Sequence, residues 1–338
     1  MKIGITIPYA SVNYSGGINV QCRMWHKGLS DLGHECYLLT PWDYFDYASF
    51  DYIIIVGIGP LLYNYVQMFK SFNHPKILSA PILDPNDMSL NKFRFYCKYY
   101  GSVKLGYRKS YHDFYMVRKE FYFFLARSEF EKKYIMEGLG LQDNQIKIVP
   151  ISMRFDNVPH IDYSLKENVC LHVSRLACPG KNVERLIEAA KKYNFKLRLV
   201  GTLNGEGERK WLDSLIGNCE NIEYLGWLDE NSLKREFSKA KVLALPSIIE
   251  GVGMVALEAA VYGCEICLTS LGGPKEYYDG RAVLVDPYDI NSIGNGVVEA
   301  MNYKKAQPEL RSYILEKYSV NNCMKQLEKY MLNKGDLK

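Results

Sequence analysis

The chain has 338 residues, more than the about 100–200 residues of one domain, so two domains are expected. Apolar residues make up 48% and charged residues 24% of the chain, a globular composition that excludes disorder, collagen and coiled-coil rods. The net charge of +4 is too small to indicate nucleic acid or membrane binding by itself. It is unevenly distributed, because residues 1–155 carry +5 and the remainder carries −1.

The nine cysteines are scattered from Cys22 to Cys323, which is typical of reduced thiols in a cytoplasmic protein. A disulfide framework would need an even, clustered set, and a zinc site would need more ligands beside the C-x-x-C at Cys264 and Cys267. The N-terminus alternates like a strand and lacks the apolar core of a signal peptide. The longest apolar run, residues 52–63, is shorter than the ~20 residues of a membrane-spanning helix. We therefore expect a cytoplasmic chain without a metal site.

Short apolar runs alternate with longer amphipathic ones along the first half, as in βαβ units with a parallel sheet. Strands are predicted at residues 2–7, 35–39, 52–56, 76–79, 123–126 and 146–149. Helices are predicted at residues 20–32, 61–72 and 129–139. A polar stretch without clean periodicity, residues 151–168, is the expected linker.

The same alternation starts again in the second half. Strands are predicted at residues 169–173, 196–200, 222–225, 242–245, 266–269 and 282–285. Helices are predicted at residues 183–193, 208–216, 230–238, 255–262, 291–301 and 320–333. The pattern predicts an α/β fold of two doubly wound, Rossmann-like domains facing each other across a cleft. Ligands of such sheets bind outside the carboxyl ends of the strands.

The loop before the first predicted helix contains Gly16 and Gly17. Glycines there let the backbone approach a ligand closely, and the amino end of a helix presents free N–H groups to a phosphate. A simple turn explains the pair equally well. The dinucleotide fingerprint G-x-G-x-x-G is absent, which disfavours an NAD-dependent dehydrogenase.

Two cations follow the first predicted strand of the second half, in the segment VSRLACPGKN. Arg175 offers a rigid fork of donors and Lys181 a mobile point charge, and together they suit a diphosphate. Solvated surface charge is the alternative interpretation of both residues.

A glycine-framed glutamate follows the strand that ends at Pro246, in the segment PSIIEGVGMVALEAA. Glu250 lies in the loop and could accept hydrogen bonds from sugar hydroxyls, while Gly251 and Gly253 allow backbone amides to approach the same ligand. Glu258 lies on the following helix, where it could reach a ribose. Favourable interaction with the helix dipole would also explain Glu258, although it would not explain Glu250.

The segment EGVGMVALEAA resembles the E-x7-E motif of the family 4 retaining glycosyltransferases, which have the two-Rossmann GT-B fold. Gly16-Gly17 and further short motifs resemble the family in chain order over nearly the whole sequence. They lie at residues 32–35, 126–129, 148–150, 173–181, 199–201, 225–228, 245–247, 272–276 and 285–287. The ordered set makes the resemblance specific.

The resemblance implies transfer of a hexose from a UDP- or GDP-sugar to a saccharide or lipid-linked saccharide, with retention of anomeric configuration. It implies no metal or other cofactor, and a role in cell-surface polysaccharide or glycolipid synthesis. Residues 1–155 would bind the acceptor and residues 156–315 the nucleotide sugar, and residues 316–338 would form a helix that crosses back onto the first domain.

The resemblance also implies roles for individual residues. Arg175 and Lys181 would neutralise the diphosphate, Glu258 would hold the ribose, and Glu250 would bind the donor sugar. Contacts to the donor are implied at Gly16, Gly17, Gly251, Val252, Gly253, Met254 and Val255, with Trp227 and Leu228 near the base.

Two features depart from the family pattern. Arg175 and Lys181 are six residues apart where the family usually has five, so the chain between them must bulge. Many members carry a histidine after the fourth strand of the first domain, whereas this chain reads SAPILDP there. Asp84 is the nearest polar group, and His112 is the other candidate for an acceptor-binding or catalytic role.

One stretch concentrates both charge and aromatic rings. From Lys92 to Lys119 there are eight basic residues and one acid, Asp113, and residues 93–124 hold 13 of the aromatics. Cations interleaved with Tyr and Phe suit an anionic membrane surface, which would explain a lipid-linked acceptor and a peripheral position on the inner face of the cell membrane. The rings could instead stack on an oligosaccharide or belong to the core of a helix pair, and nucleic acid is not expected.

Two other functions stay open at this point. A nucleotide-sugar epimerase of the same architecture would use the cleft without a sugar acceptor. A catalytically silent sugar-binding subunit is conceivable because the first-domain histidine is missing, although intact Arg175, Lys181, Glu250 and Glu258 argue against loss of donor binding.

Overall fold

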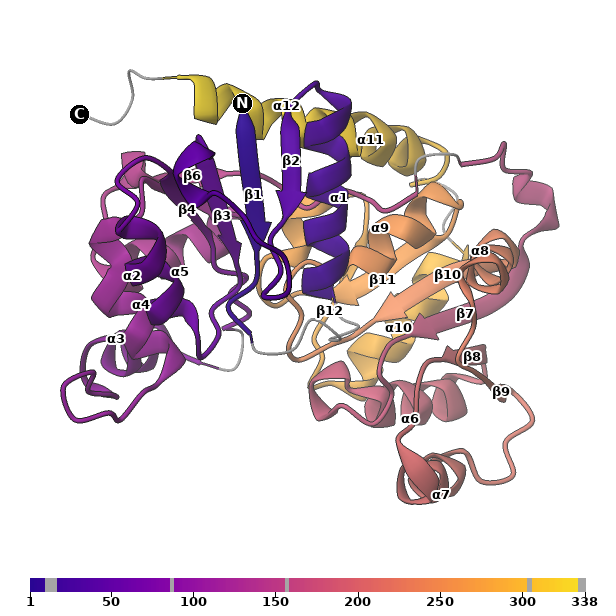
Figure 1. The fold of residues 1–338 in the computed structure, drawn as a ribbon. Coiled ribbons are helices and arrows are strands. Elements are labelled where there is room, and N and C mark those ends of the chain that lie inside the picture. The colour runs from indigo at the N-terminus through magenta and orange to yellow at the C-terminus, as the bar shows by residue number, and fades with distance from the viewer. Residues whose placement is uncertain (10–16, 86–87, 156–157, 303–305, 334–338) are drawn as a thin grey trace. The chain divides into compact units, whose positions relative to one another are not determined.

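The computed structural model describes residues 1–9, 17–85, 88–155, 158–302 and 306–333 (Figure 1). Its contacts divide the chain into two compact units. The first unit is Met1–Arg154 with Tyr318–Lys338, and the second is Phe155–Lys317. Each unit is built on a six-stranded sheet in which neighbouring strands run parallel.

The sheet of the first unit has the strand order β2-β1-β3-β4-β5-β6. Its strands are β1 (Lys2–Thr6), β2 (Glu35–Leu38), β3 (Tyr52–Val56), β4 (Lys76–Ala80), β5 (Phe123–Ala126) and β6 (Ile146–Ile148). All six were predicted from the sequence to within two residues. Because the order reverses direction next to β1, the loops after β1 and β3 diverge at the carboxyl edge of this sheet.

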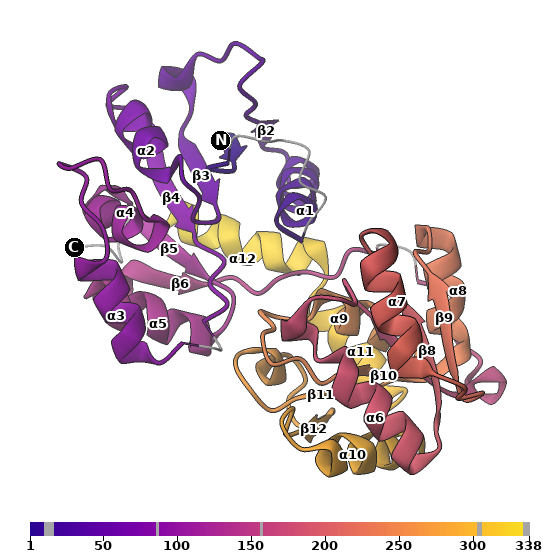
Figure 2. The ribbon, with the colours of Figure 1, turned by 90° about the horizontal axis from the view of Figure 1, so that it is seen from below.

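Helices cover both faces of the first sheet (Figure 2). One face carries α1 (Gly17–Asp31) and α12 (Val320–Leu332). The other carries α2 (Leu62–Lys70), α3 (Leu90–Tyr99), α4 (Ser110–Val117) and α5 (Glu129–Leu139). Helices α3 and α4 were predicted only as one of several interpretations of this stretch, a helix pair with aromatic rings in the core, and without bounds. Exposed aromatic and basic residues obscure the periodicity of their few buried positions, such as Phe93 and Cys97.

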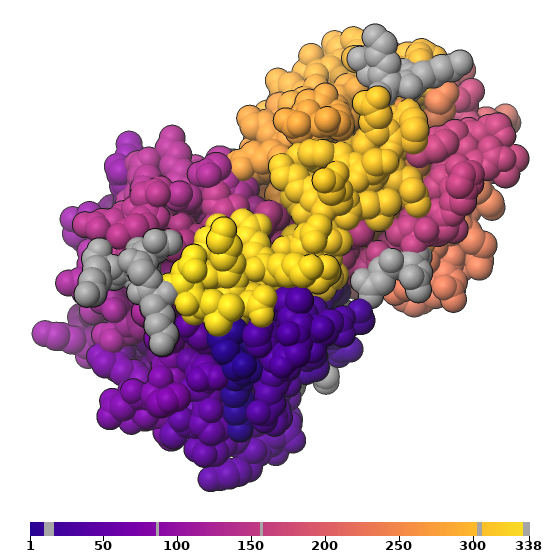
Figure 3. Space-filling model, turned by 90° about the horizontal axis from the view of Figure 1, so that it is seen from above, coloured from indigo at the N-terminus to yellow at the C-terminus, as the bar shows by residue number. Residues whose placement is uncertain are grey.

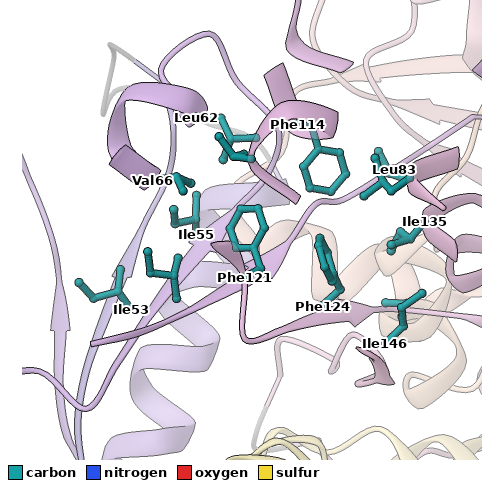
Figure 4. Close-up of a cluster of buried hydrophobic side chains, with 14 of the residues drawn as sticks. Ile53, Ile55, Leu62, Val66, Leu83, Phe114, Phe121, Phe124, Ile135 and Ile146 are labelled. Atoms are coloured by element: carbon teal, nitrogen blue, oxygen red, sulfur yellow. The ribbon is translucent and has the colours of Figure 1, made fainter. Parts of the chain in front are cut away.

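Strand β3 shows how one sequence serves two cores. Ile53 and Ile55 point into the cluster under α2–α5, which Figure 4 shows, and Ile54 and Val56 point into the cluster under α1 and α12. Successive side chains of a strand face opposite sides of the sheet, so a strand buried on both faces is apolar throughout. All five residues of β3 are accordingly buried.

The last helix of the chain belongs to the first unit. Figure 3 shows α12, in yellow, lying against the indigo N-terminal segment. Met324 and Leu327 of α12 pack in the same core as Trp25 and Leu29 of α1. The two helices approach closely at Gly28, where an added Cβ would lie 2.5 Å from Val320 Cγ1 and 2.6 Å from Met324 Cγ.

The sheet of the second unit has the order β12-β11-β10-β7-β8-β9. Its strands are β7 (Glu167–Val173), β8 (Lys196–Val200), β9 (Ile222–Gly226), β10 (Ala240–Leu245), β11 (Glu265–Thr269) and β12 (Val283–Val285). Counted from β7, this is the Rossmann order 3-2-1-4-5-6. The strands predicted from the sequence are again all present.

The second sheet is also covered on both faces. One face packs against α6 (Val183–Tyr193), α7 (Gly205–Ile216) and α10 (Ile290–Asn302). On the other face lie α8 (Glu230–Lys239) and α9 (Met254–Val261), and α11 (Glu309–Lys317) packs on α9. Helix α11 was not predicted because it buries only Leu310 and Ile314.

We predict opposite effects of the same substitution in two helices. Gly28→Ala should destabilise the protein by about 1–3 kcal/mol, because the new methyl group meets α12 in a packed core. Gly207→Ala in α7 should stabilise it by about 0.5–1 kcal/mol, because nothing lies within 4 Å of the added Cβ and alanine favours a helix. Urea unfolding of both variants tests this, and an equal shift of both midpoints would contradict the packing.

Candidate functional site

The strand order of the second sheet points to one place for a ligand. From β7 the chain moves outward to β8 and β9, and it then returns to the other side of β7 with β10, β11 and β12. The loops that leave β7 and β10 therefore separate at the carboxyl ends of adjacent strands, which is where open α/β sheets bind ligands. Both sequence segments predicted to carry chemistry in this half, residues 173–182 and 246–253, are these two loops.

Backbone hydrogen bonds join the two loops. The N–H groups of Ile248 and Ile249 both donate to the carbonyl of Gly180, at 2.9 and 3.1 Å. The stretch between Arg175 and Lys181, predicted to bulge, ends in a 3₁₀ turn at Pro179–Lys181. The loops thus form one hydrogen-bonded unit, which fixes the position of the side chains that they carry.

Asn182 ties a third loop to the first two. Its side-chain Nδ2 donates to the carbonyls of Pro246, at 2.8 Å, and of Pro287, at 2.7 Å, and its Oδ1 accepts from Arg185. The residue is 4% exposed and adopts a left-handed conformation with φ of 60°, which Asn tolerates better than most side chains. The loops after β7, β10 and β12 therefore converge on one buried amide.

Lys181 and Glu250 form an ion pair across the two loops. Lys181 Nζ lies 2.9 Å from Glu250 Oε2, and the same oxygen accepts a hydrogen bond from Ser247 Oγ at 3.1 Å. The side chains are 27% and 13% exposed. The pair thus sets an ammonium group and a carboxylate side by side at the carboxyl ends of β7 and β10.

Helix α9 begins directly after this pair. Gly253 precedes it with φ of 73°, a left-handed conformation that favours glycine and that turns the chain from the Glu250 loop into the helix. The backbone N–H groups of the first turn, which starts at Met254, then face the ligand side of the helix with its positive dipole end. Glu258 lies on α9, is 4% exposed and has further contacts within the protein.

His172 lies near the carboxyl end of β7, next to the two loops, and its side chain joins β7 to β10. The imidazole is buried between β7 and β10, with Nδ1 2.8 Å from the carbonyl of Ala244 and Nε2 2.8 Å from Ser174 Oγ. The carbonyl must accept, so Nδ1 carries the proton and the neutral Nε2 accepts from the serine hydroxyl. Burial is the main cause that lowers the pKa of His172 to about 4. The charge of Lys181 acts in the same direction, and the hydrogen bond that His172 donates to the Ala244 carbonyl acts in the opposite direction.

The other predicted donor residues lie on three segments of the chain. Arg175 is exposed on the loop after β7. Trp227, 70% exposed, and Leu228 follow β9, which is the outermost strand of the sheet. Gly17 is the exposed first residue of α1 in the first unit, and Gly16 lies outside the described residues. Roles for these residues in donor binding stay predictions.

Asp84 lies on the loop after β4, at the carboxyl edge of the first sheet. Its Oδ1 is 2.8 Å from Arg127 Nη2, and the carboxylate is 41% exposed. Arg127 also pairs with buried Glu131 at 2.9 Å. Burial alone would lower the pKa of Arg127, but the carboxylates of Glu131 and Asp84 outweigh it and raise that pKa above its usual value. The arginine thus fixes the position of Asp84, whose outer face meets solvent.

His112 has the surroundings of a packing residue. It is 7% exposed, its Nδ1 lies 3.1 Å from the carbonyl of Cys97, and its ring lies against Gly101, where an added Cβ would be 2.7 Å from His112 Cβ. Neighbouring Asp113, 1% exposed, is held by Arg108 at 2.9 Å. These contacts give His112 and Asp113 a structural task and do not favour the catalytic alternative.

Sequence reasoning assigned no role to three residues that build the site. Asn182 stands directly before a helix, as a capping residue would, but its bonds reach Pro246 and Pro287, far away in sequence. His172 acts through Ala244 on the neighbouring strand, and Ser247 acts through Glu250, three residues away in the same loop. Strand pairing or the conformation of the loop would have been needed to find these residues.

The described part of the chain holds neither a cluster of metal ligands nor a helix that could cross a membrane. No group of three or more His, Cys, Asp or Glu side chains there could hold a metal ion. Likewise, none of the helices there combines the length and the apolar character that a membrane crossing requires. The nine cysteines are all free thiols, including Cys264 and Cys267 on β11 and its approach.

Residues 157–317, which nearly coincide with the second unit, match the family model described as glycosyl transferases group 1. The second unit is thus similar in sequence to that family. The fold agrees as well, because the chain superposes on Anabaena Alr3699/HepE in complex with UDP-glucose with a TM-score of 0.72 at 14% identity, over 98% of this chain and 99% of that one. At this identity the likeness shows the fold alone, and it confirms the predicted GT-B class.

Two curated proteins illustrate the sequence similarity. The uncharacterized glycosyltransferase MJ1607 of Methanocaldococcus jannaschii is 31% identical over 48% of this chain and 41% of its own length. The O-antigen chain mannosyltransferase B of Escherichia coli is 22% identical over 70% of this chain and 65% of its own length. The aligned segments thus cover less than two thirds of either relative.

We predict that Asn182 stabilises the fold through its amide. Asn182→Gly keeps a residue suited to positive φ but removes both donated hydrogen bonds, so the free energy of unfolding should fall by about 2 kcal/mol. Asn194→Gly is the control, because Asn194 is exposed with φ of 52°. Urea unfolding that shifts both variants alike would show that the amide bonds contribute nothing.

His172 should make the protein less stable as the pH falls. Its folded pKa of about 4 lies below the ordinary 6.5, so the unfolded chain takes up a proton first, and lowering the pH from 7 to 5 should cost about 2 kcal/mol. His172→Asn, which can keep the bond to Ala244, should lack this contribution, and His160→Asn at an exposed position should retain it. Unfolding in urea at both pH values measures the difference, and identical pH dependence in all three proteins would refute it.

Proposed function

We propose that this chain is a retaining glycosyltransferase of family 4 that transfers a hexose from a UDP- or GDP-sugar to a saccharide or lipid-linked saccharide. The observation that carries the proposal is the Lys181–Glu250 pair at the carboxyl ends of β7 and β10. It sets a cation for a diphosphate and a carboxylate for a sugar side by side. The match of residues 157–317 to group 1 glycosyl transferases supports the same conclusion.

The diphosphate of the donor would lie against the loop that leaves β7. Arg175 supplies planar, bidentate donors, and Lys181 a charge on an ammonium group already oriented by Glu250. The amides at the start of α9 would add dipolar attraction for the same anion. Glu258 would bind the ribose, and the backbone near Trp227 and Leu228 the base.

The donor sugar would lie over Glu250. A carboxylate accepts two or more hydrogen bonds, so Glu250, which Lys181 and Ser247 hold at Oε2, suits vicinal sugar hydroxyls. Backbone amides of the segment from Gly251 to Val255 would complete the contacts. Together they would fix the anomeric carbon next to the diphosphate.

Catalysis would consist of stabilising the diphosphate as it leaves. The bond between the anomeric carbon and the diphosphate oxygen breaks first, the sugar acquires oxocarbenium character, and Arg175, Lys181 and the α9 amides take up the charge of the leaving group. The acceptor hydroxyl then attacks from the face that the diphosphate leaves, so the configuration is retained, and its proton passes to the departing diphosphate oxygen. In this scheme the protein's cations do the work for which other transferases use a metal ion.

The first unit would bind the acceptor. Asp84, held by Arg127 at the carboxyl edge of the first sheet, is the polar group that stands where many family members have a histidine. Its exposed carboxylate could accept a hydrogen bond from an acceptor hydroxyl. A cytoplasmic transferase of cell-surface polysaccharide or glycolipid synthesis fits this scheme.

Donor binding tests the proposal directly. UDP or GDP at about 100 Kd should stabilise the chain by about 2.7 kcal/mol in thermal unfolding. Lys181→Met should weaken that binding about ten- to hundred-fold, because it removes a charge-assisted bond, and Lys191→Met at an exposed position of α6 should not. Glu250→Gln should bind the nucleotide normally and lose transfer by about ten- to hundred-fold.

Three results would count against the scheme. If neither nucleotide stabilised the chain, the donor site would not exist as described. Binding of a donor without transfer to any saccharide would favour a silent binding subunit or an epimerase. A product whose anomeric configuration, read by NMR, is inverted relative to the donor would exclude the retaining mechanism.

A further inference from the structure

The connection between α3 and α4 forms a projecting hairpin. In Figure 1 this loop extends beyond the ends of both helices on the lower left. We call residues 98–109 the hairpin. Its two arms meet in an isolated antiparallel bridge between Ser102 and Tyr107, with Ser102 N–H donating to the Tyr107 carbonyl at 2.8 Å.

A tight turn sets the tip of the hairpin. Gly106 N–H donates to the Val103 carbonyl at 3.2 Å, and Gly106 has φ of 69°, so the chain reverses over Lys104 and Leu105. Leu105 N–H also donates to Ser102 Oγ at 3.3 Å. The tip is therefore a formed turn that presents one cation and one aliphatic side chain to solvent.

Buried groups fix the base of the hairpin to the unit. His112 of α4 lies under Gly101, and Arg108 binds Asp113, which is 1% exposed. The Arg108 guanidinium also lies 4.6 Å from the ring centre of Tyr63 on α2. The hairpin is thus anchored at its base while its outer part stays exposed.

The exposed surface formed by the hairpin and the end of α3 carries unusually many apolar side chains. Leu105 is 85% exposed, Tyr99 71% and Phe95 54%. Aromatic rings form a continuous chain of neighbours through Tyr96. The ring distances are 5.8 Å from Tyr99 to Phe95, 6.1 Å from Phe95 to Tyr96, 4.6 Å from Tyr96 to Tyr100 and 6.0 Å from Tyr100 to Tyr107. Contiguous exposed apolar surface of this kind marks an interaction site.

Lysines frame this surface, and they are not neutralised by carboxylates. The arginines of the stretch are engaged, since Arg94 pairs with Glu137 and Arg118 donates to the Tyr115 carbonyl. Within the part of the chain that the structure describes, none of the five lysines of the stretch has a carboxylate partner. These lysines are Lys92, Lys98, Lys104, Lys109 and Lys119. Lys109 Nζ instead lies 5.4 Å from the ring of Tyr100 and 5.1 Å from that of Tyr107. The surface is therefore positive as well as apolar.

We propose that the hairpin docks on the surface of an anionic lipid bilayer. Leu105 would enter the boundary between headgroups and acyl chains, the tyrosines would lie at headgroup depth, and Lys98 and Lys104 would contact lipid phosphates. The aliphatic, aromatic and basic side chains of the hairpin would thus each meet the part of the bilayer that suits their polarity. A purely saccharide partner would leave the lysines without counter-charges and Leu105 in water.

Single-stranded RNA fits the same residues less well. Base stacking needs free aromatic faces, whereas Tyr96 and Tyr100 pack edge-on at 4.6 Å and Phe95 packs on Tyr99. An aliphatic side chain at the tip offers nothing to a phosphate backbone. Charge and apolar surface together favour lipid.

The hairpin lies on the same side of the first unit as the proposed acceptor site. In Figure 1 the hairpin and the carboxyl ends of the first sheet lie on the same lower side of the first unit. Asp84 follows β4 at that edge, and α3, which leads into the hairpin, begins only six residues later at Leu90. A bilayer held by the hairpin would therefore present a lipid-linked acceptor to the proposed acceptor side, a consequence that rests on the proposed function.

Vesicle binding of the full chain tests the proposal. The protein should co-sediment with phosphatidylglycerol-containing vesicles at low salt and not with pure phosphatidylcholine. Lys98→Ala with Lys104→Ala should weaken the partition about 25-fold, at about five-fold per lysine. Leu105→Asp should abolish it. Leu165→Asp, which alters a leucine that is 72% exposed in the second unit, and Lys191→Ala with Lys210→Ala are the matched controls and should bind as the unaltered chain does.

Specific results would overturn the docking surface. The first is that the chain does not bind anionic vesicles, and the second is that Leu105→Asp and Leu165→Asp bind them equally well. The third is that the hairpin binds an RNA oligonucleotide and not the vesicles. UDP and GDP binding, followed by thermal unfolding of the same variants, keeps the two proposals separate. Normal nucleotide binding in a variant that has lost vesicle binding supports the docking surface. Loss of both activities would show that the variant does not fold. In that case Leu105→Ser, a smaller change of polarity, replaces Leu105→Asp in the same vesicle assay.

Discussion

Parallel strands must be covered on both faces, and most features of this molecule follow from that constraint. A crossover to the next parallel strand needs a helix, and helices cover both faces of each sheet, so strands such as β3 are apolar throughout. All carboxyl ends then point to one edge of each sheet. The loops after β7 and β10, which carry Lys181 and Glu250, leave the second sheet at that edge.

At the edge of the second sheet, rigidity is supplied by main-chain carbonyls. Gly180, Pro246 and Pro287 each accept a hydrogen bond from a neighbouring loop. These bonds hold Lys181 and Glu250 at ion-pair distance without any need for the pair itself to stabilise the fold, which half-buried ion pairs rarely do. A charge constellation that is fixed in advance reorganises little when a charged ligand reacts, and this is the main source of electrostatic catalysis.

The sequence was most informative where a residue's task is local. Strands buried on both faces, loops after strands and the glycine-framed Glu250 are visible as short patterns, so every strand of both sheets was predicted. Helices α3 and α4 were only one of several interpretations of their stretch, because their exposed faces are as aromatic as their buried ones. Asn182, Ser247 and His172 escaped notice because their partners are 64, three and 72 residues away and are brought close only by strand pairing or loop geometry. Asp84 and His112 looked alike in sequence, and only burial and partners separate them.

The packing of α12 on α1 has a consequence for biosynthesis. Trp25 and Leu29 of α1 share their core with a helix from the opposite end of the chain, and the whole second unit, Phe155–Lys317, is translated in between. At about 5–20 residues per second, the ribosome needs on the order of ten to thirty seconds to supply the missing helix. During that interval the nascent first unit exposes an apolar face to the cell while the second unit can already fold. The window makes the first unit the part of the newborn chain that depends on chaperones.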